Sequence, residues 1–205
     1  MQYVELRQRL EDFTIFSLGD IRRADPDFHR RRLNEWQDKG YIKKIIKGYY
    51  VFSGLGLNEK VLFEIANRIY SPSYVSFEMA LSYYGLIPES VYGITSACTR
   101  RTYRFKTNIA EFIYRSIKPE LFFGYSLVEY NSKYFKMASP EKAILDFFYI
   151  NKSIKNADDF ASLRINKDIF LKLIDEKRLY ALLGKFKQKS LTRRVRLFCR
   201  FIKYA

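Results

Sequence analysis

The stretch from Asp25 to Phe52 constrains the fold of this chain more than any other. Asp25 and Pro26 form the start signal of a helix, because aspartate caps free N–H groups and proline loses nothing at the first helical position. Gly40 supplies the left-handed residue that ends such a helix. The spacing therefore predicts a helix of about four turns between Asp25 and Gly40.

The residues after Gly40 change to the pattern of a β-hairpin. Two runs rich in isoleucine, tyrosine and valine, residues 41–46 and 49–52, flank the pair Lys47-Gly48. Glycine adopts the positive φ that tight hairpin turns require, so this pair is a suitable turn, although weaker than Asn-Gly. The stretch is thus predicted to be a helix followed at once by a basic hairpin.

Two shorter helices are predicted ahead of this unit. Apolar residues within Tyr3–Phe13 recur at helical spacing, and Ser17 with Asp20 three residues later caps a second helix over residues 17–24. The order of helix, short helix, longer helix and hairpin is that of a winged helix-turn-helix. We therefore predict a DNA-binding domain over residues 1–53, with its third helix in the major groove.

Basic side chains favour DNA as the ligand of this domain. Residues 29–47 contain seven lysines or arginines and two acidic residues. Arg30, Arg31 and Asn34 are expected to read base edges from the outer face of the helix, while the hairpin lysines meet phosphates. The predicted DNA-binding residues are Arg30, Arg31, Asn34, Arg32, Lys43, Lys44 and Lys47. The alternatives are a solvated charged face and a winged helix that docks on protein.

The overall charge supports the same class of partner. The chain of 205 residues carries a net charge of +15, which favours nucleic acid first and an anionic membrane surface second. Hydrophobic residues make up 48% of the chain, enough for a substantial core. No apolar run is long enough to span a bilayer and no signal peptide is recognisable, so we expect a cytoplasmic protein.

Residues for catalysis or metal binding are scarce. His29 is the single histidine, and we expect it near the buried side of the third helix. Cys98 and Cys199 lie about a hundred residues apart, without metal-ligand spacing. Zinc sites and histidine-activated nucleophiles therefore lack their components. We expect no cofactor, no metal and no enzymatic activity.

A second domain is expected over residues 57–205, after the flexible segment Ser53–Gly56. Helices and strands fall in separate blocks of the sequence, which predicts an α+β fold with a mainly antiparallel sheet and terminal helices. The expected strands are Tyr92–Thr99, Ile109–Ser116, Ser126–Tyr130 and Tyr134–Ala138, within a β-rich region that begins at residue 90. The expected helices cover residues 58–70, 76–84, 167–174, 177–186 and 191–202, with another that starts at Ser139.

The C-terminal helix is unusually basic. Residues 185–205 contain eight lysines or arginines and no acidic residue, beside an apolar face that includes Val195 and Phe198. Three interpretations stay open: a packed helix with a solvated outer face, a second contact to the DNA backbone, or a helix that lies on a membrane surface.

Two segments resemble the AbiEi family of antitoxins. The first, SPSYVSFEMALSYYGLIPESVYGITSACTRRTYRF, spans residues 71–105 and places Tyr-Val-Ser before a helix that ends in Tyr-Tyr-Gly-Leu-Ile-Pro. The second, MASPEKAILDFFY, spans residues 137–149 and starts a helix with Ser-Pro-Glu-Lys-Ala-x-x-Asp. The predicted N-terminal winged helix also matches the family's layout. The resemblance covers most of the chain through residue 150.

This resemblance implies an antitoxin of a bacterial type IV toxin–antitoxin system, often linked to phage defence. It implies that the N-terminal domain represses its own operon by binding inverted repeats in the promoter, so that two copies occupy one operator. It also implies that the C-terminal domain counteracts a nucleotidyltransferase-like toxin without needing a stable complex. The alternatives are a regulator with no toxin partner and an enzyme that modifies the toxin or nucleic acid.

A few residues that match the family motifs define the candidate site of the second domain. Ser76 and Ser139 are interpreted as helix caps. Arg100, Arg101, Lys142 and Asp146 have no evident role in folding. An ion pair of Asp146 with Arg100 or Lys142 is favoured over catalysis, because phosphoryl chemistry usually needs a second acid or a metal cluster. The motif residues are Tyr74, Ser76, Arg100, Arg101, Lys142 and Asp146.

Overall fold

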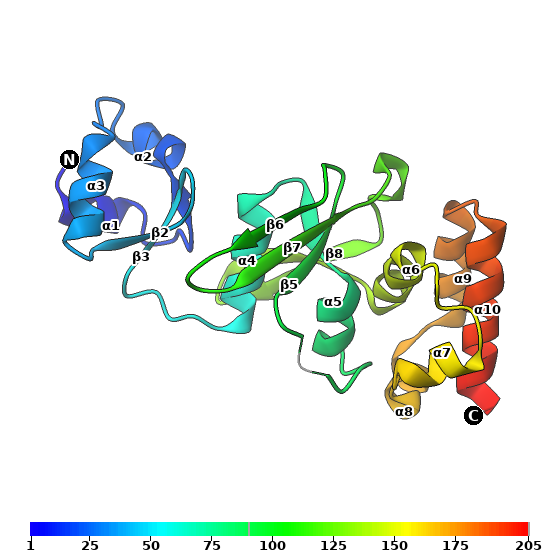
Figure 1. The fold of residues 1–205 in the computed structure, drawn as a ribbon. Coiled ribbons are helices and arrows are strands. Elements are labelled where there is room, and N and C mark those ends of the chain that lie inside the picture. The colour runs from blue at the N-terminus through cyan, green and yellow to red at the C-terminus, as the bar shows by residue number, and fades with distance from the viewer. Residues whose placement is uncertain (90, 205) are drawn as a thin grey trace.

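The chain runs from one end of an elongated molecule to the other (Figure 1). The computed structural model describes residues 1–89 and 91–204. A small helical unit lies at the N-terminal end, a six-stranded sheet in the centre, and a group of helices at the C-terminal end. The predicted α+β class is confirmed. Residues 90 and 205, the start of the predicted β-rich region and the end of the predicted second domain, lie outside the described residues.

The first 53 residues combine three helices with a small sheet. The helices are α1 (Tyr3–Arg9), α2 (Leu18–Ala24) and α3 (Arg31–Asp38), and the strands are β1 (Phe16–Ser17), β2 (Ile42–Ile46) and β3 (Tyr49–Phe52). The strand order is β1-β3-β2, and both pairings are antiparallel. Apolar side chains from the helices and the sheet form a core of their own, with Leu6, Ile21, Leu33, Trp36 and Ile42 among its members.

The third helix is shorter than the sequence predicts. It begins at Arg31, not at Asp25, and its eight residues make about two turns in place of four. Asp25 instead follows α2, where its N–H closes the last turn of that helix. The residues between α2 and α3 change direction, so that Phe28 enters the N-terminal core and packs against Trp36. The burial of Phe28 outweighs the capping signal of Asp25 and Pro26.

Other local signals in this unit are confirmed. Ser17 and Asp20 form a reciprocal capping box at the start of α2. Gly40 follows α3 with a φ of +69°, and Gly48 turns the hairpin with a φ of +89°. Glycine occupies both positions because other residues rarely adopt positive φ. The first helix ends at residue 9, four residues earlier than predicted.

The central sheet has the strand order β6-β7-β5-β4-β9-β8. Its strands are β4 (Ser73–Val75), β5 (Ile94–Cys98), β6 (Tyr103–Lys106), β7 (Glu111–Ser116), β8 (Tyr125–Tyr130) and β9 (Lys133–Ala138). Three of the five pairings are antiparallel, while β5 pairs with β7 and β4 pairs with β9 in parallel. The sheet is therefore mixed, with two parallel pairings that the predicted, mainly antiparallel sheet does not include.

Two strands of the central sheet have no counterpart in the sequence-based prediction. All three residues of β4 are buried, so this strand shows no alternation of apolar and polar positions. The edge strand β6 is mostly exposed, with only Phe105 half-buried. Short and exposed strands carry little of the apolar periodicity from which strands are predicted.

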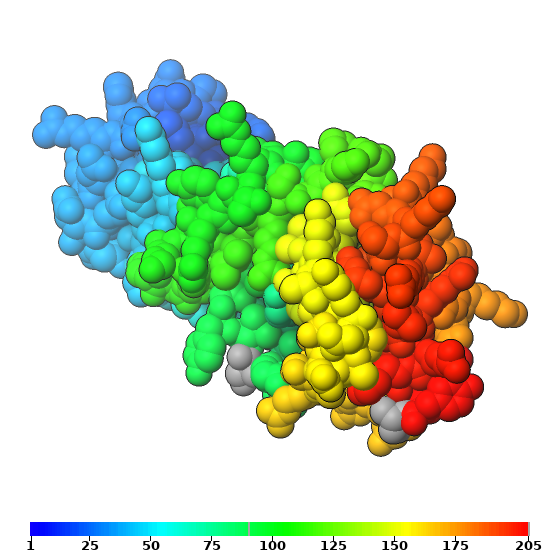
Figure 2. Space-filling model, turned by 45° about the vertical axis from the view of Figure 1, so that its right-hand side comes forward, coloured from blue at the N-terminus to red at the C-terminus, as the bar shows by residue number. Residues whose placement is uncertain are grey.

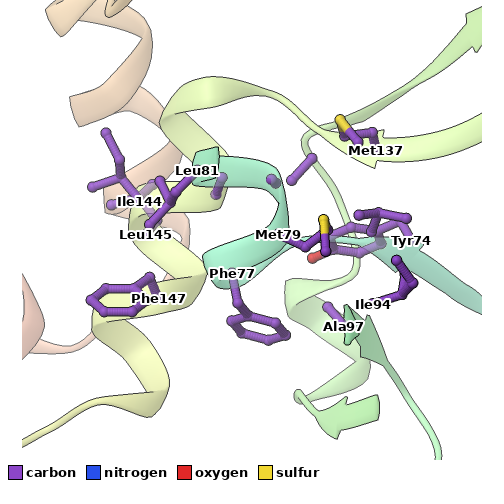
Figure 3. Packing of buried hydrophobic residues seen from close by; sticks show 14 of the residues in the cluster. Tyr74, Phe77, Met79, Leu81, Ile94, Ala97, Met137, Ile144, Leu145 and Phe147 are labelled. Atoms are coloured by element: carbon purple, nitrogen blue, oxygen red, sulfur yellow. The ribbon is translucent and has the colours of Figure 1, made fainter. Parts of the chain in front are cut away.

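Helices pack beside the sheet and form the C-terminal end. They are α4 (Glu59–Ile69), α5 (Phe77–Tyr83), α6 (Pro140–Ile150), α7 (Ala157–Ser162), α8 (Lys167–Leu173), α9 (Glu176–Lys185) and α10 (Lys189–Tyr204), with a 3-10 turn at Pro119–Leu121. The α6 helix packs against α5, α9 and α10, and Figure 3 shows Leu81 of α5 beside Ile144 and Leu145 of α6. None of the described helices combines the length and the apolar character needed to cross a membrane.

The N-terminal unit packs against the central part of the molecule. Residues 53–58, which connect the two, contain no helix or strand, but Ile15, Ile45 and Val51 join the core of the second part. The Thr14 hydroxyl donates to Glu64 of α4 at 2.6 Å, and Lys133 donates to the Thr14 hydroxyl at 3.0 Å. The contact surface between the two parts is thus both apolar and hydrogen-bonded.

A second polar contact reaches from α4 to the cap of α2. The guanidinium of Arg68 lies 2.9 Å from one carboxylate oxygen of the buried Asp20. The other oxygen of Asp20 accepts from the N–H and the hydroxyl of Ser17, at 2.8 and 2.7 Å. One carboxylate therefore caps α2 and fastens it to the second part.

We expect the substitution Asp20→Asn to lower the free energy of unfolding by about 1–2 kcal/mol at neutral pH, because hydrogen bonds to a charged group are stronger than neutral ones. Burial opposes ionisation of Asp20, but hydrogen bonds from Ser17 and the Arg68 guanidinium outweigh it and lower the pKa of the carboxyl group. A depressed pKa stabilises the fold above the unfolded value, and this contribution is lost as pH falls through the folded one. The loss measured by urea denaturation should therefore shrink below about pH 4. A loss that does not change with pH would contradict the ion pair.

Candidate functional site

The α3 helix exposes a polar face because its apolar side chains enter the N-terminal core. Leu33 and Trp36 are buried, and the Trp36 ring lies 5.8 Å from the ring of Tyr3. Arg31 and Asn34 lie on the opposite face, and both are exposed. Arg30, at the N-cap position of α3, is exposed as well. The three side chains predicted to read bases are therefore all accessible from solvent.

The hairpin adds three exposed cations beside this helix. Lys43 and Lys44 of β2 and Lys47 of the turn are exposed, while Ile42 and Ile45 of the same strand are buried. We use the name basic face for the exposed residues Arg30, Arg31, Asn34, Lys43, Lys44 and Lys47, which come from α3 and from the hairpin packed against it. Exposed Glu35 and Asp38 on α3 reduce its charge but leave it positive.

Two residues of the stretch differ from the sequence-based expectation. Arg32 is half-buried, and its guanidinium donates to the backbone carbonyl of Met1, so it is turned toward α1 and away from the basic face. His29 is exposed, so the prediction that it lies near the buried side of the helix is wrong. The cause is again the shorter α3, because His29 precedes the helix and does not follow its periodicity.

A second group of polar side chains is buried between β4 and α6. Lys142 and Asp146, one turn apart on α6, form an ion pair with exposed side-chain fractions of 0% and 1%. The hydroxyl groups of Tyr74 and Ser76 each donate to the other oxygen of Asp146 at 2.8 Å. The structure thus brings together four of the six motif residues. Of the two predicted partners of Asp146, Arg100 and Lys142, it is Lys142 that forms the ion pair.

Aromatic rings surround the ammonium group of Lys142. The nitrogen lies 4.6 Å from the ring centre of Phe123 and 4.7 Å from that of Phe186, close enough for cation–π attraction. Gly124 packs on the aliphatic stem of Lys142, where a Cβ would come within 3.1 Å of it. Burial lowers the pKa of Lys142 and raises that of Asp146, while the opposite charge of each partner counteracts both shifts.

Because the Ser76 side chain belongs to this network, it does not cap α5 as predicted. Ser76 stands at the N-cap position, but its side chain makes no capping bond and is directed to Asp146. The hydroxyl of Thr95 on β5 accepts from the N–H of Met79 at 3.0 Å and donates to the carbonyl of Ser76 at 2.7 Å. The interpretation of Ser76 as the side-chain cap is therefore wrong. Nothing in the local sequence indicates Thr95, because β5 reaches α5 only in the folded chain. Ser139 caps α6 as predicted.

Arg100 and Arg101 lie apart from this network, at the connection between β5 and β6. The guanidinium of Arg100 stacks 4.4 Å above the ring of Tyr70 and approaches the carbonyl oxygen of Ser71 at 3.5 Å. Arg101 is exposed. The buried network itself offers no surface to a substrate, and the described residues contain no group of three or more potential metal ligands. Its evident effect is to fasten β4 to α6.

No family model matches this chain, and no curated protein shows significant similarity to it.

Proposed function

We propose that the N-terminal unit is a winged helix-turn-helix that binds double-stranded DNA and represses transcription. The observation that carries this proposal is the basic face, an exposed polar helix face beside a lysine-bearing hairpin. The element order of α1, α2, α3 and the β2–β3 hairpin supports the same assignment.

Some side chains of the basic face would contact bases, and others would contact phosphates. Arg30 and Arg31 match the paired acceptors of guanine, and Asn34 matches adenine. The lysines of the hairpin would contact phosphates, which fix the protein on the duplex without reading its sequence. Arg32 is excluded from this proposal, because it binds the backbone near the start of the chain.

The affinity of the protein for duplex DNA should fall steeply as the salt concentration rises. Each neutralised phosphate contributes about −0.9 to the slope of log K against log salt concentration. Replacing Lys43, Lys44 and Lys47 with glutamine should therefore make the slope shallower by about 2–3 and weaken binding to all sequences alike. Fluorescence anisotropy on a duplex obtained by selection from random DNA would measure both quantities. An unchanged slope would show that the hairpin does not meet phosphates.

We further propose that the second part acts as the antitoxin of a type IV toxin–antitoxin system. The support is the resemblance of residues 71–105 and 137–149 to AbiEi family antitoxins. Asp146 and the three motif residues that contact it, Tyr74, Ser76 and Lys142, would then maintain the fold of this part, while its surface counteracts the toxin. The protein would act in the cytoplasm and need no cofactor for either task.

Co-expression tests the antitoxin proposal. If a neighbouring gene encodes a nucleotidyltransferase-like toxin, its expression should arrest growth, and the full chain should restore growth. The double substitution Arg30→Glu/Arg31→Glu should restore growth equally well, because the antitoxin function is assigned to the other part. Failure of the intact protein to restore growth would refute the antitoxin role and leave the DNA-binding proposal standing.

A further inference from the structure

The longest described helix, α10, has two opposite faces with different roles. Its apolar face is buried against α6, α7 and α8 through Leu191, Val195, Phe198 and Ile202. Its outer face carries Lys189, Arg193, Arg196 and Arg200, spaced four, three and four residues apart. This spacing aligns the four cations in one stripe along the helix, with a rise of about 4.5–6 Å between neighbours. All four are exposed, and none forms a salt bridge with a described residue.

A groove lies beside this stripe and is lined by Lys189, Arg193 and Arg200. One depression of about 670 Å³ lies between Lys152 and Lys155 of the α6–α7 connection and Lys189 and Arg193 of α10. Cations therefore stand on both walls. Figure 2 shows the two walls side by side, with the α6–α7 region in yellow and α10 in red. The groove between them is a positively charged channel.

The groove continues toward the end of α10 and becomes aromatic. An adjoining depression of about 730 Å³ shares Lys155 with the first and is lined by Arg200, Phe201 and Tyr204. Tyr204 is 83% exposed, although large aromatic side chains are usually covered. A channel of cations that ends at an exposed ring combines the two features with which proteins bind single-stranded nucleic acid.

A buried arginine holds the two walls in place. Arg194 points inward from α10 and is 8% exposed. Its guanidinium donates to the carbonyl oxygens of Phe148 at 2.8 Å and Asn151 at 2.9 Å, and to that of Ile154 at 3.3 Å. These bonds fasten α10 to the connection that carries Lys152 and Lys155. The groove is therefore preformed.

We propose that this groove binds a single strand of nucleic acid, with phosphates on the cations of its walls and a base on Tyr204. Stacking on the exposed ring of Tyr204 requires an unpaired base, so this end of the groove favours a single strand over a duplex. A membrane surface would need the apolar face of α10, which is already used in the core. The proposal does not depend on DNA binding by the N-terminal unit, which lies at the other end of the molecule.

Fluorescence anisotropy with the full chain tests this groove. The probes are a single-stranded DNA and a single-stranded RNA of one mixed sequence, a duplex of that sequence, and vesicles with anionic lipid. The test variant is Lys189→Gln/Arg193→Gln/Arg200→Gln, which removes three cations that line the groove. The control is Lys60→Gln/Lys106→Gln/Lys118→Gln, which removes the same charge from exposed positions elsewhere. Thermal unfolding establishes that both variants are folded.

We expect the test variant to weaken single-strand binding by at least about tenfold and to make the salt slope shallower by about 2, while the control binds nearly as the intact protein does. Tyr204→Ala should weaken binding by about fivefold or more, as the loss of one stacked base does. Tighter binding of one of the two single strands would identify its sugar as the preferred one. Arg30→Glu/Arg31→Glu should reduce the single-strand affinities only modestly, through the long-range field.

Four results would overturn the proposal. They are the absence of single-strand binding, equal losses in test and control variants, duplex binding that depends on the groove as strongly as single-strand binding does, and preferential binding to the vesicles. None of these results bears on sequence-specific recognition through the basic face.

Discussion

Replacing Asp146 with asparagine is expected to lower the free energy of unfolding by about 3–5 kcal/mol, because it leaves the charge of Lys142 buried and unpaired. Both side chains are inaccessible to solvent, so water cannot replace the lost partner. The aromatic rings of Phe123 and Phe186 supply only part of the compensation that the carboxylate gives to the ammonium group. Urea denaturation of the full chain would measure the loss.

Two control variants separate the effect of an unpaired buried charge from the effect of losing any ion pair. Glu111→Gln removes an ion pair with Arg104 that lies on the surface, and it should change stability little. Lys142→Met combined with Asp146→Leu removes both charges and should recover part of the loss. Recovery will be incomplete, because the hydroxyls of Tyr74 and Ser76 then lack an acceptor, at a cost of about 1–3 kcal/mol each. Equal effects of Asp146→Asn and Glu111→Gln would contradict a buried ion pair.

Reversing the charge of Arg30 and Arg31 to glutamate should weaken binding of the selected duplex by about 100-fold or more. A well-placed arginine–guanine pair contributes about 1–3 kcal/mol of discrimination, and two glutamates add repulsion from the phosphates. Both side chains are exposed and unnecessary for the core, so the variant should remain folded. The affinity would be measured by anisotropy, and repression by a reporter gene behind the native promoter.

The matched control is Lys106→Glu/Lys118→Glu, which makes the same change in net charge on the second part. It should reduce affinity only modestly, through the long-range field. Asn34→Ala should instead relax the preference for one base while leaving phosphate contacts intact. Normal repression by the Arg30→Glu/Arg31→Glu variant would mean that α3 does not read the operator.

Signals that act within a few residues predict much of this fold. The capping pair Ser17 and Asp20, the cap of Ser139 and the turn at Gly48 involve neighbours in sequence, and all three are confirmed. The start of α3 is mispredicted because Phe28 gains more from burial in the core than Asp25 gains as a cap. Tertiary packing overrides local preference where the two compete.

Local sequence signals likewise predict only part of the candidate site. An ion pair between Lys142 and Asp146 follows from helix geometry, since residues four apart lie on one face. The two hydroxyls that complete the network and the rings around the ammonium group come from distant segments. Contacts of this kind depend on the parallel pairing of β4 with β9, which places Tyr74 beside α6 and which no local pattern reveals.

The carboxylate of Asp20 has a consequence for how the N-terminal unit is held. Because it accepts bonds from Ser17 and from Arg68, α2 cannot tilt without disturbing α4. Ile45 and Val51 add apolar contacts on the same side. The direction in which α3 points is therefore determined by the body of the protein, and the short connection at residues 53–58 does not act as a free pivot.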